Sequence, residues 1–175
     1  QCRPFQVAAG GGVSAQPESV AEADLVLQTG GAVIGPSTMA AVGRLIYVVP
    51  SVYGQLPLAD RYSIARLIGR LTRLDGRPEG ALLLAGPGRW GTADPALGVP
   101  VSFAEISRVA ALCEIIEMRE GLVPDVSLGT HFFNDLVETR ILYLALIPGK
   151  EGNFVNASLI EQAPLTETPA PFLPK

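Results

Sequence analysis

An apolar run that ends in a glycine-rich turn constrains the fold of this chain more than any other feature. Residues 81–85 are Ala-Leu-Leu-Leu-Ala, and residues 86–92 contain three glycines, one arginine and the only tryptophan. A short apolar run bounded by turn residues is typical of a buried strand. Glycine allows close backbone approach and left-handed conformations. The sequence therefore predicts a core strand followed by a tight, specialised loop.

The loop at 86–92 has two interpretations. Arg89 offers a planar fork of donors that suits phosphate or carboxylate, and Trp90 offers a flat surface with one N–H donor. The first interpretation is a site for an anionic ligand, formed by Gly86, Gly88, Arg89, Trp90, Gly91 and Thr92. The second is a strand-ending turn in which Trp90 packs on the core and Arg89 pairs with an acid.

Composition limits the class of protein. A chain of 175 residues, 48% of them hydrophobic, is long enough to bury the core of one compact domain. A net charge of −4 disfavours nucleic acid as a partner. No membrane span is expected, because Glu114 and Glu117 interrupt the best apolar stretch, at 109–118. The two cysteines are far apart, which predicts no metal site and favours a reducing, cytoplasmic setting.

The pattern of apolar residues predicts a mixed α/β (α+β) domain, with a mixed sheet of about five or six strands packed with two or three helices. The expected strands are 25–27, 32–34, 45–49, 81–85, 109–116 and 141–147. The first two are expected to form a hairpin around Gly30 and Gly31. The stretch 109–116 fits helical periodicity almost as well. The expected helices are 60–74, with Asp60 as N-cap, 104–107 and 130–138.

A row of arginines follows the polar face of the helix expected at 60–74. Its members are Arg66, Arg70, Arg73 and Arg77. Such a row suits an acidic partner or a polyphosphate. It is more often the solvated face of an amphipathic helix, which is the favoured interpretation.

His131, the only histidine, stands at the expected start of a helix. A histidine there can act as a general acid or base, or accept a phosphoryl group, and the helix N-terminus would favour an anionic ligand. Asn134 and Asp135 could then orient the ring or a substrate. The competing interpretation is a structural histidine bonded to a loop carbonyl, with Phe132 and Phe133 in the core.

Two parts of the chain carry a resemblance to a known family. Gln1-Cys2-Arg3-Pro4 resembles the Gln-x-Arg-Pro signature that closes the ATP-grasp domain of phosphoenolpyruvate synthase and pyruvate phosphate dikinase. The stretches 82–103 and 123–136, with Gly-Pro-Gly-Arg-Trp-Gly and Gly-Thr-His-Phe-Phe, are similar to the C-terminal region of PEP/pyruvate-binding-domain proteins of that family. The resemblance implies that Gln1 and Arg3 are the remnant of an ATP phosphate site.

The expected organisation combines this resemblance with composition. Residues 1–6 would be the end of the ATP-grasp domain, 7–24 a linker, 25–160 a globular domain and 161–175 a proline-rich tail. The absence of an initiator methionine also suggests a piece of a larger protein. The resemblance implies ATP and Mg²⁺ as cofactors of the ATP-grasp domain and none for this chain alone.

The function expected from the resemblance is that of an accessory C-terminal domain in a phosphoenolpyruvate synthase-like, ATP-dependent phosphotransferase. Arg89, the backbone of 86–92 and His131 would converge on one small anionic ligand, which the isolated chain binds without turnover. The expected partner is the ATP-grasp domain, and a homo-oligomer is compatible with this function. Two alternatives stay open: a structural or oligomerisation module without a ligand, and a diverged phosphohistidine carrier. The family's Gly-Gly-x-Thr-Ser-His element is not matched around Thr130 and His131.

Overall fold

A five-stranded sheet forms the centre of the protein. The computed structural model describes residues 19–31, 33–36, 38–74, 79–117, 126–127 and 130–162. The strand order is β2-β8-β7-β4-β3. The four parallel members are β3 (Val42–Tyr47), β4 (Ala81–Pro87), β7 (Ala111–Ile115) and β8 (Leu142–Leu146), and β2 (Val33–Ile34) pairs antiparallel to β8. The predicted mixed α/β class and sheet size are confirmed, and 109–116 holds a strand.

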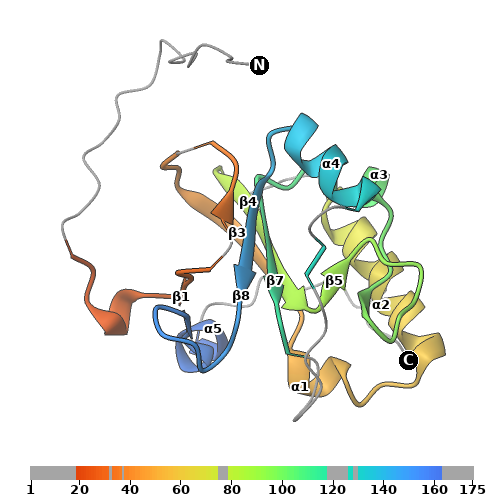
Figure 1. Cartoon of the computed structure of the whole chain (residues 1–175), viewed down its shortest axis with the longest axis horizontal. Coiled ribbons are helices and arrows are strands. Elements are labelled where there is room, and N and C mark those ends of the chain that lie inside the picture. Colours follow the sequence, from red (N-terminus) through yellow and green to blue (C-terminus); the bar gives the residue numbers. More distant parts are fainter. Residues whose placement is uncertain are drawn as a thin grey trace.

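The two faces of the sheet are covered differently (Figure 1). Helices α2 (Leu58–Leu71), α3 (Phe103–Ile106) and α4 (His131–Glu138) lie on one side. The parallel strands are neighbours in chain order, and right-handed crossovers then place the connecting helices on one face. The opposite side carries the pair β1 (Leu27–Gln28) and β9 (Phe154–Val155), with α5 (Ala157–Gln162).

Short elements complete the described chain. A 3-10 turn, η1 (Glu22–Asp24), precedes β1, and α1 (Pro50–Tyr53) follows β3. The pair β5 (Arg89–Trp90) and β6 (Gly98–Val99) forms a small parallel ladder after β4. The helices therefore exceed the two or three expected, because α1 and α5 are too short to show helical periodicity. None of the helices in the described ranges has the length and apolar character needed to cross a bilayer.

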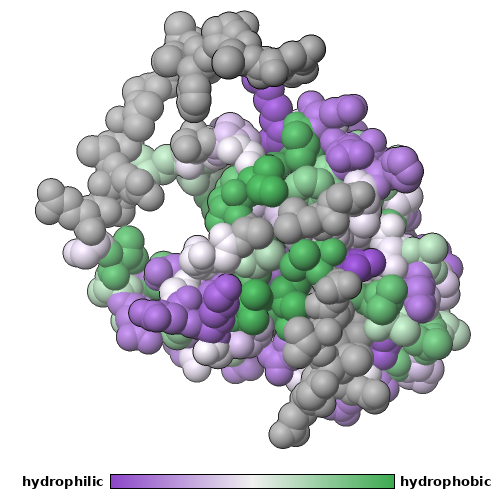
Figure 2. Space-filling view, in the orientation of Figure 1, coloured by the Kyte–Doolittle hydropathy of each residue, from purple (hydrophilic) through white to green (hydrophobic). Residues whose placement is uncertain are grey.

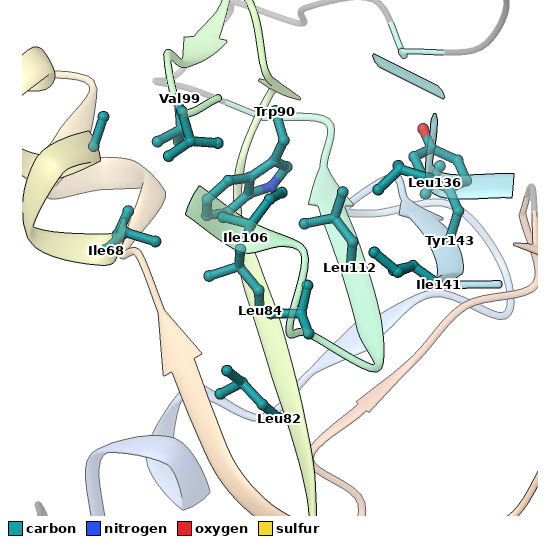
Figure 3. Close-up of a cluster of buried hydrophobic side chains, with 14 of the residues drawn as sticks. Ile68, Leu82, Leu84, Trp90, Val99, Ile106, Leu112, Leu136, Ile141 and Tyr143 are labelled. Atoms are coloured by element: carbon teal, nitrogen blue, oxygen red, sulfur yellow. The ribbon is translucent and has the colours of Figure 1, made fainter. Parts of the chain in front are cut away.

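The larger core lies between the sheet and its three helices, with the indole of Trp90 near its middle (Figure 3). Leu84 and Leu112 from the sheet and Ile106 from α3 surround that ring. Successive strand residues point to opposite faces, so Leu112 joins this core while Cys113 joins a smaller cluster on the other face. Each fully buried large apolar side chain contributes about 1.5–3 kcal/mol.

The prediction of a hairpin around Gly30 and Gly31 is wrong. β1 pairs with β9, and β2 pairs with β8, so the two segments never pair with each other. The hydroxyl of Thr29 donates to the carbonyl oxygen of Ala145 at 2.6 Å. A Cβ at Gly31 would lie 2.8 Å from that same oxygen. Gly31 therefore serves a close crossing past β8 rather than a hairpin turn.

Helix α2 begins earlier and ends earlier than expected. Pro57 occupies the N-cap position, and Asp60 lies in the first turn, so Asp60 is not the N-cap. Thr72 is the C-cap residue, and Arg44 of β3 donates to the last-turn carbonyl of Leu71 at 3.0 Å. Such donors satisfy carbonyls that a helix end leaves without partners.

The described part of the arginine row along and just after α2 faces solvent, as the favoured interpretation predicts. Arg66, Arg70 and Arg73 are exposed, which confirms a solvated face for those three residues. Arg77 lies outside the described residues.

A different arginine, Arg61, is buried in the first turns of α2. Its guanidinium donates to the carbonyl oxygens of Pro95 at 2.8 Å, Gly54 at 2.9 Å and Leu56 at 3.2 Å, and it stacks 5.2 Å from the centre of the Tyr53 ring. One cation thus fixes two loops against one helix. No pattern of neighbouring residues distinguishes Arg61 from the exposed arginines of this helix.

The domain boundaries expected from sequence fall partly outside the described residues. Within the segment 7–24, the turn η1 is described, and within 161–175 residues 161 and 162 belong to α5. The rest of the proposed tail, residues 1–6 and the proposed remnant residues Gln1 and Arg3 lie outside the described residues.

Replacing Arg61 with methionine removes the donors but keeps much of the apolar stem. We expect R61M to lower the free energy of unfolding by about 3 kcal/mol, because two buried carbonyls and one part-buried carbonyl lose a charged donor. Chemical denaturation measures this loss. The matched control R66M alters an exposed arginine of the same helix and should stay within about 0.5 kcal/mol of wild type. Equal effects of the two substitutions would contradict the bridging role.

Candidate functional site

The two loops that carry the predicted site residues leave the same edge of the sheet. β4 and β7 are parallel neighbours, so the segments that follow them begin at their shared carboxyl edge. This edge is where open α/β sheets usually bind ligands. In the ladder, Gly86 of β4 lies directly beside Glu114 of β7. The candidate site is therefore built around Glu114.

Glu114 is fully buried and accepts four hydrogen bonds. Its Oε1 accepts from the backbone N–H of Trp90 at 3.1 Å and from the hydroxyl of Ser127. Its Oε2 accepts from the backbone N–H of Ser127 at 2.9 Å and from the hydroxyl of Tyr143 at 2.6 Å. One carboxyl group thus joins the loop after β4, the loop after β7 and strand β8.

The charge state of this carboxyl is shifted by its surroundings. Burial raises the pKa of Glu114 above its ordinary value, and the bonds from Ser127, Tyr143 and Trp90 oppose the shift by stabilising the carboxylate. Burial and the neighbouring Glu114 also raise the pKa of Tyr143. The four donors offset part of the cost of burying a charge, and protonation can relieve the remainder.

The backbone donors of residues 88–91 are used inside the protein. The N–H of Gly88 donates to Ile115 at 2.8 Å, that of Arg89 to Leu97 at 3.0 Å and that of Gly91 to Val99 at 3.1 Å. The N–H of Trp90 donates to Glu114, and its indole N–H donates to the Cys113 carbonyl at 3.3 Å. These amides are therefore not open to an anionic ligand.

Glycine is required at two points of this loop. Gly88 and Gly91 have φ angles of 62° and 70°, a left-handed region that other residues adopt at a cost. A Cβ at Gly88 would overlap the carbonyl oxygen of Leu97, and a Cβ at Gly91 would overlap the ring of Phe132. Gly91 therefore lies directly against the first turn of α4. The segment 86–92 therefore meets the described part of 127–135, through Gly91 and Phe132 and through Glu114.

The predicted residues of α4 lie mostly on its outer side. Thr130 is the N-cap, and its hydroxyl accepts from the N–H of Phe133 at 3.1 Å. His131, Asn134 and Asp135 are exposed. Phe132 and Phe133 pack against the larger core, as expected from the sequence. Phe133 meets the ring of Tyr143 edge-on at 5.2 Å between centroids, which places α4 over β8.

The remaining loop residues divide between turn and core. Thr92 and Asp94 close the turn, since the N–H of Asp94 donates to the Thr92 hydroxyl at 3.1 Å and the N–H of Ala96 donates to Asp94 Oδ1 at 2.8 Å. Gly86 is buried, and a Cβ there would lie 2.8 Å from Cζ2 of Trp90. Arg89 is half-buried, and the side chain of Trp90 is 1% exposed.

The buried groups at this edge have little access to a substrate. Cys113 is fully buried, and burial with the nearby Glu114 raises the pKa of its thiol to about 12, so it is a poor nucleophile. Glu114 points into the core. Within the described ranges, no group of three or more His, Cys, Asp or Glu is placed to hold a metal ion. The arrangement joins elements together and holds one proton-binding group out of water.

Sequence reasoning missed the three residues that organise this edge: Glu114, Ser127 and Tyr143. Glu114 was noted only as a charge that interrupts an apolar stretch. The available signal was its position within a strand whose neighbours on both sides are buried, because a carboxyl there must find donors. Ser127 and Tyr143 carried no comparable signal.

Comparison with known proteins adds no relationship. The chain matches no protein-family model, no curated protein and no solved structure.

Replacing Glu114 with glutamine tests the four-bond arrangement. The amide nitrogen of E114Q would face a donor N–H, so we expect a loss of about 2 kcal/mol in the free energy of unfolding at neutral pH. Because the pKa of Glu114 is raised, the folded state binds its proton more readily than the unfolded state. This contribution to stability is complete below the ordinary glutamate pKa of about 4.3 and is lost as pH rises through the folded pKa.

The gap in stability between wild type and E114Q should therefore widen as pH is lowered from 8 towards the ordinary glutamate pKa. Denaturation curves over that range measure it. Glu138 is exposed on α4, so E138Q serves as the control and should show no such trend. A gap that narrows on acidification would contradict a raised pKa for Glu114.

Gly91 and Gly149 form a matched pair for testing the contact between the loops. Both have positive φ, at 70° and 77°, but a Cβ at Gly149 meets no atom within 4 Å. We expect G149A to show only backbone strain, about 1 kcal/mol, and G91A to lose about 1–3 kcal/mol more by overlap with Phe132. Adding F132L should recover part of the loss in G91A and none in G149A. Thermal unfolding of the four variants decides this.

Proposed function

We propose that this chain is an accessory, non-catalytic α/β domain of a phosphoenolpyruvate synthase-like, ATP-dependent phosphotransferase. In this proposal residues 86–92, 126–127 and 130–135 form a rigid structural joint rather than an anion site. ATP and Mg²⁺ belong to the partner ATP-grasp domain. A cytoplasmic location is part of the proposal, and the free thiol of Cys113 is compatible with it. The family assignment rests on the sequence resemblance alone.

One observation favours the structural role over anion binding. The N–H groups of residues 88–91 all donate within the protein, and one of them donates to the buried carboxyl of Glu114. Phosphate-binding loops work by the opposite arrangement, in which several backbone N–H groups point towards an empty site. A loop that surrounds a carboxyl group and a buried indole instead holds two segments in fixed register.

The test uses a protein that joins this chain to its ATP-grasp domain. We expect R89A and H131N to leave the phosphotransfer kcat unchanged, because neither side chain takes part in chemistry. G91V, which disrupts the joint, should lower the melting temperature and lower activity in parallel. Calorimetric titration of the chain with ATP, phosphoenolpyruvate or inorganic phosphate should give no binding.

Two results would overturn the proposal. The first is a fall in kcat of about 100-fold or more in R89A or H131N without a change in melting temperature, as expected when an acid–base group is lost. The second is an acid-labile phosphate on the peptide that contains His131 after incubation with labelled ATP. The latter would establish the phosphohistidine carrier.

A further inference from the structure

A groove of about 550 Å³ lies on the face of the sheet opposite to the three helices. Ile115 and Leu146, at the carboxyl ends of β7 and β8, contribute to its lining together with Tyr47 at the end of β3. Phe154 of β9 and Ile160 of α5 line it as well. Its volume falls within the range of small-molecule sites, about 300–1,000 Å³.

The groove exists because this face is covered by little structure. The opposite face is covered by α2, α3 and α4, whereas here the cover is a two-stranded sheet and the six residues of α5. Figure 2 shows hydrophobic residues gathered in the middle of the viewed side, with hydrophilic residues at lower left, where Figure 1 places α5 and the loop before it. Exposed Val49 continues the apolar lining towards α1.

The charged groups of the groove are of one sign. Glu117, which follows β7, and Glu161 of α5 both line it, and both are exposed. Both contribute, after burial and together with Cys113, to raising the pKa of the Tyr47 hydroxyl, so the two carboxylates lie within electrostatic range of the same phenol. None of the described lining residues is Lys, Arg or His. The groove therefore combines an apolar surface, two aromatic rings and two carboxylates that its described lining leaves uncompensated.

We propose that this groove binds a small amphipathic cation, with an apolar body against the half-buried side chains of Phe154 and Ile160 and an ammonium or guanidinium group near Glu117 and Glu161. Burial of the apolar body supplies most of the affinity. The carboxylates select the positive charge, and the aromatic rings of Tyr47 and Phe154, which also line the groove, favour a cation as well. An anion of the same shape would be repelled by both carboxylates. This site lies on the other face of the sheet from the joint that contains residues 86–92.

The test compares three probes that share one apolar body and differ in charge: 4-phenylbutylamine, 4-phenylbutanol and 4-phenylbutyrate. Binding is followed by calorimetry and by methyl NMR of Ile115, Leu146 and Ile160. We expect the amine to bind more tightly than the alcohol by about two- to five-fold for each carboxylate, and the acid to bind most weakly. The substitutions E117Q and E161Q should each weaken the amine by that factor and leave the alcohol unchanged.

Both substitutions change exposed residues, so folding should be preserved. E138Q, an equally conservative change on α4 across the sheet, is the matched control and should leave all three affinities unchanged. Equal affinity for amine and alcohol, or equal weakening by E138Q, would overturn the proposal. So would amine binding that leaves the three methyl signals unmoved. Self-association of the chain that shifts those methyl signals, with no amine binding, would instead assign the groove to a second copy and reject the small cation.

Discussion

The carboxyl group of Glu114 accepts hydrogen bonds from three elements that are distant in sequence, and the carboxyl edge of the sheet depends on it. Its partners are the backbone of Trp90, both donors of Ser127 and the hydroxyl of Tyr143. The carboxyl group is shielded from water. Removing it would therefore leave the buried N–H and O–H groups that donate to it without an acceptor. One side chain therefore ties both loops to the sheet.

Local patterns in the sequence predicted most of the elements but not how they associate. The apolar runs at 81–85 and 141–147 and the helical spacing in 60–74 identify β4, β8 and α2, since periodicity is a property of neighbouring residues. Strand pairing is decided by distant residues. Gly30 and Gly31 gave a hairpin signal, yet the approach of that segment to Ala145 sends β1 and β2 to different partners.

The polar residues that matter most were the least predictable. Arg61 and Arg66 occupy the same helix, and only the positions of Gly54 and Pro95 in the fold decide that Arg61 is buried. Glu114 was more predictable, because a carboxyl group among buried strand residues requires hydrogen-bond donors, whichever segment supplies them. What its strand could not reveal was that one donor is the tryptophan loop. The glycine-rich segment is specialised, as its sequence predicts. Its residues pack into the core, and its backbone N–H groups donate within the protein instead of pointing towards a ligand.

Strand β7 links the joint to the groove on the far face. Alternation along the strand points Glu114 towards the helices and the next residue, Ile115, towards the groove. Four hydrogen bonds hold Glu114, and the carbonyl of Ile115 accepts from Gly88, so the end of β7 has little freedom to shift. Because this part of the lining is already ordered, a ligand loses less binding free energy to ordering the protein. The polar network on one face of the sheet thus preorganises the apolar surface on the other.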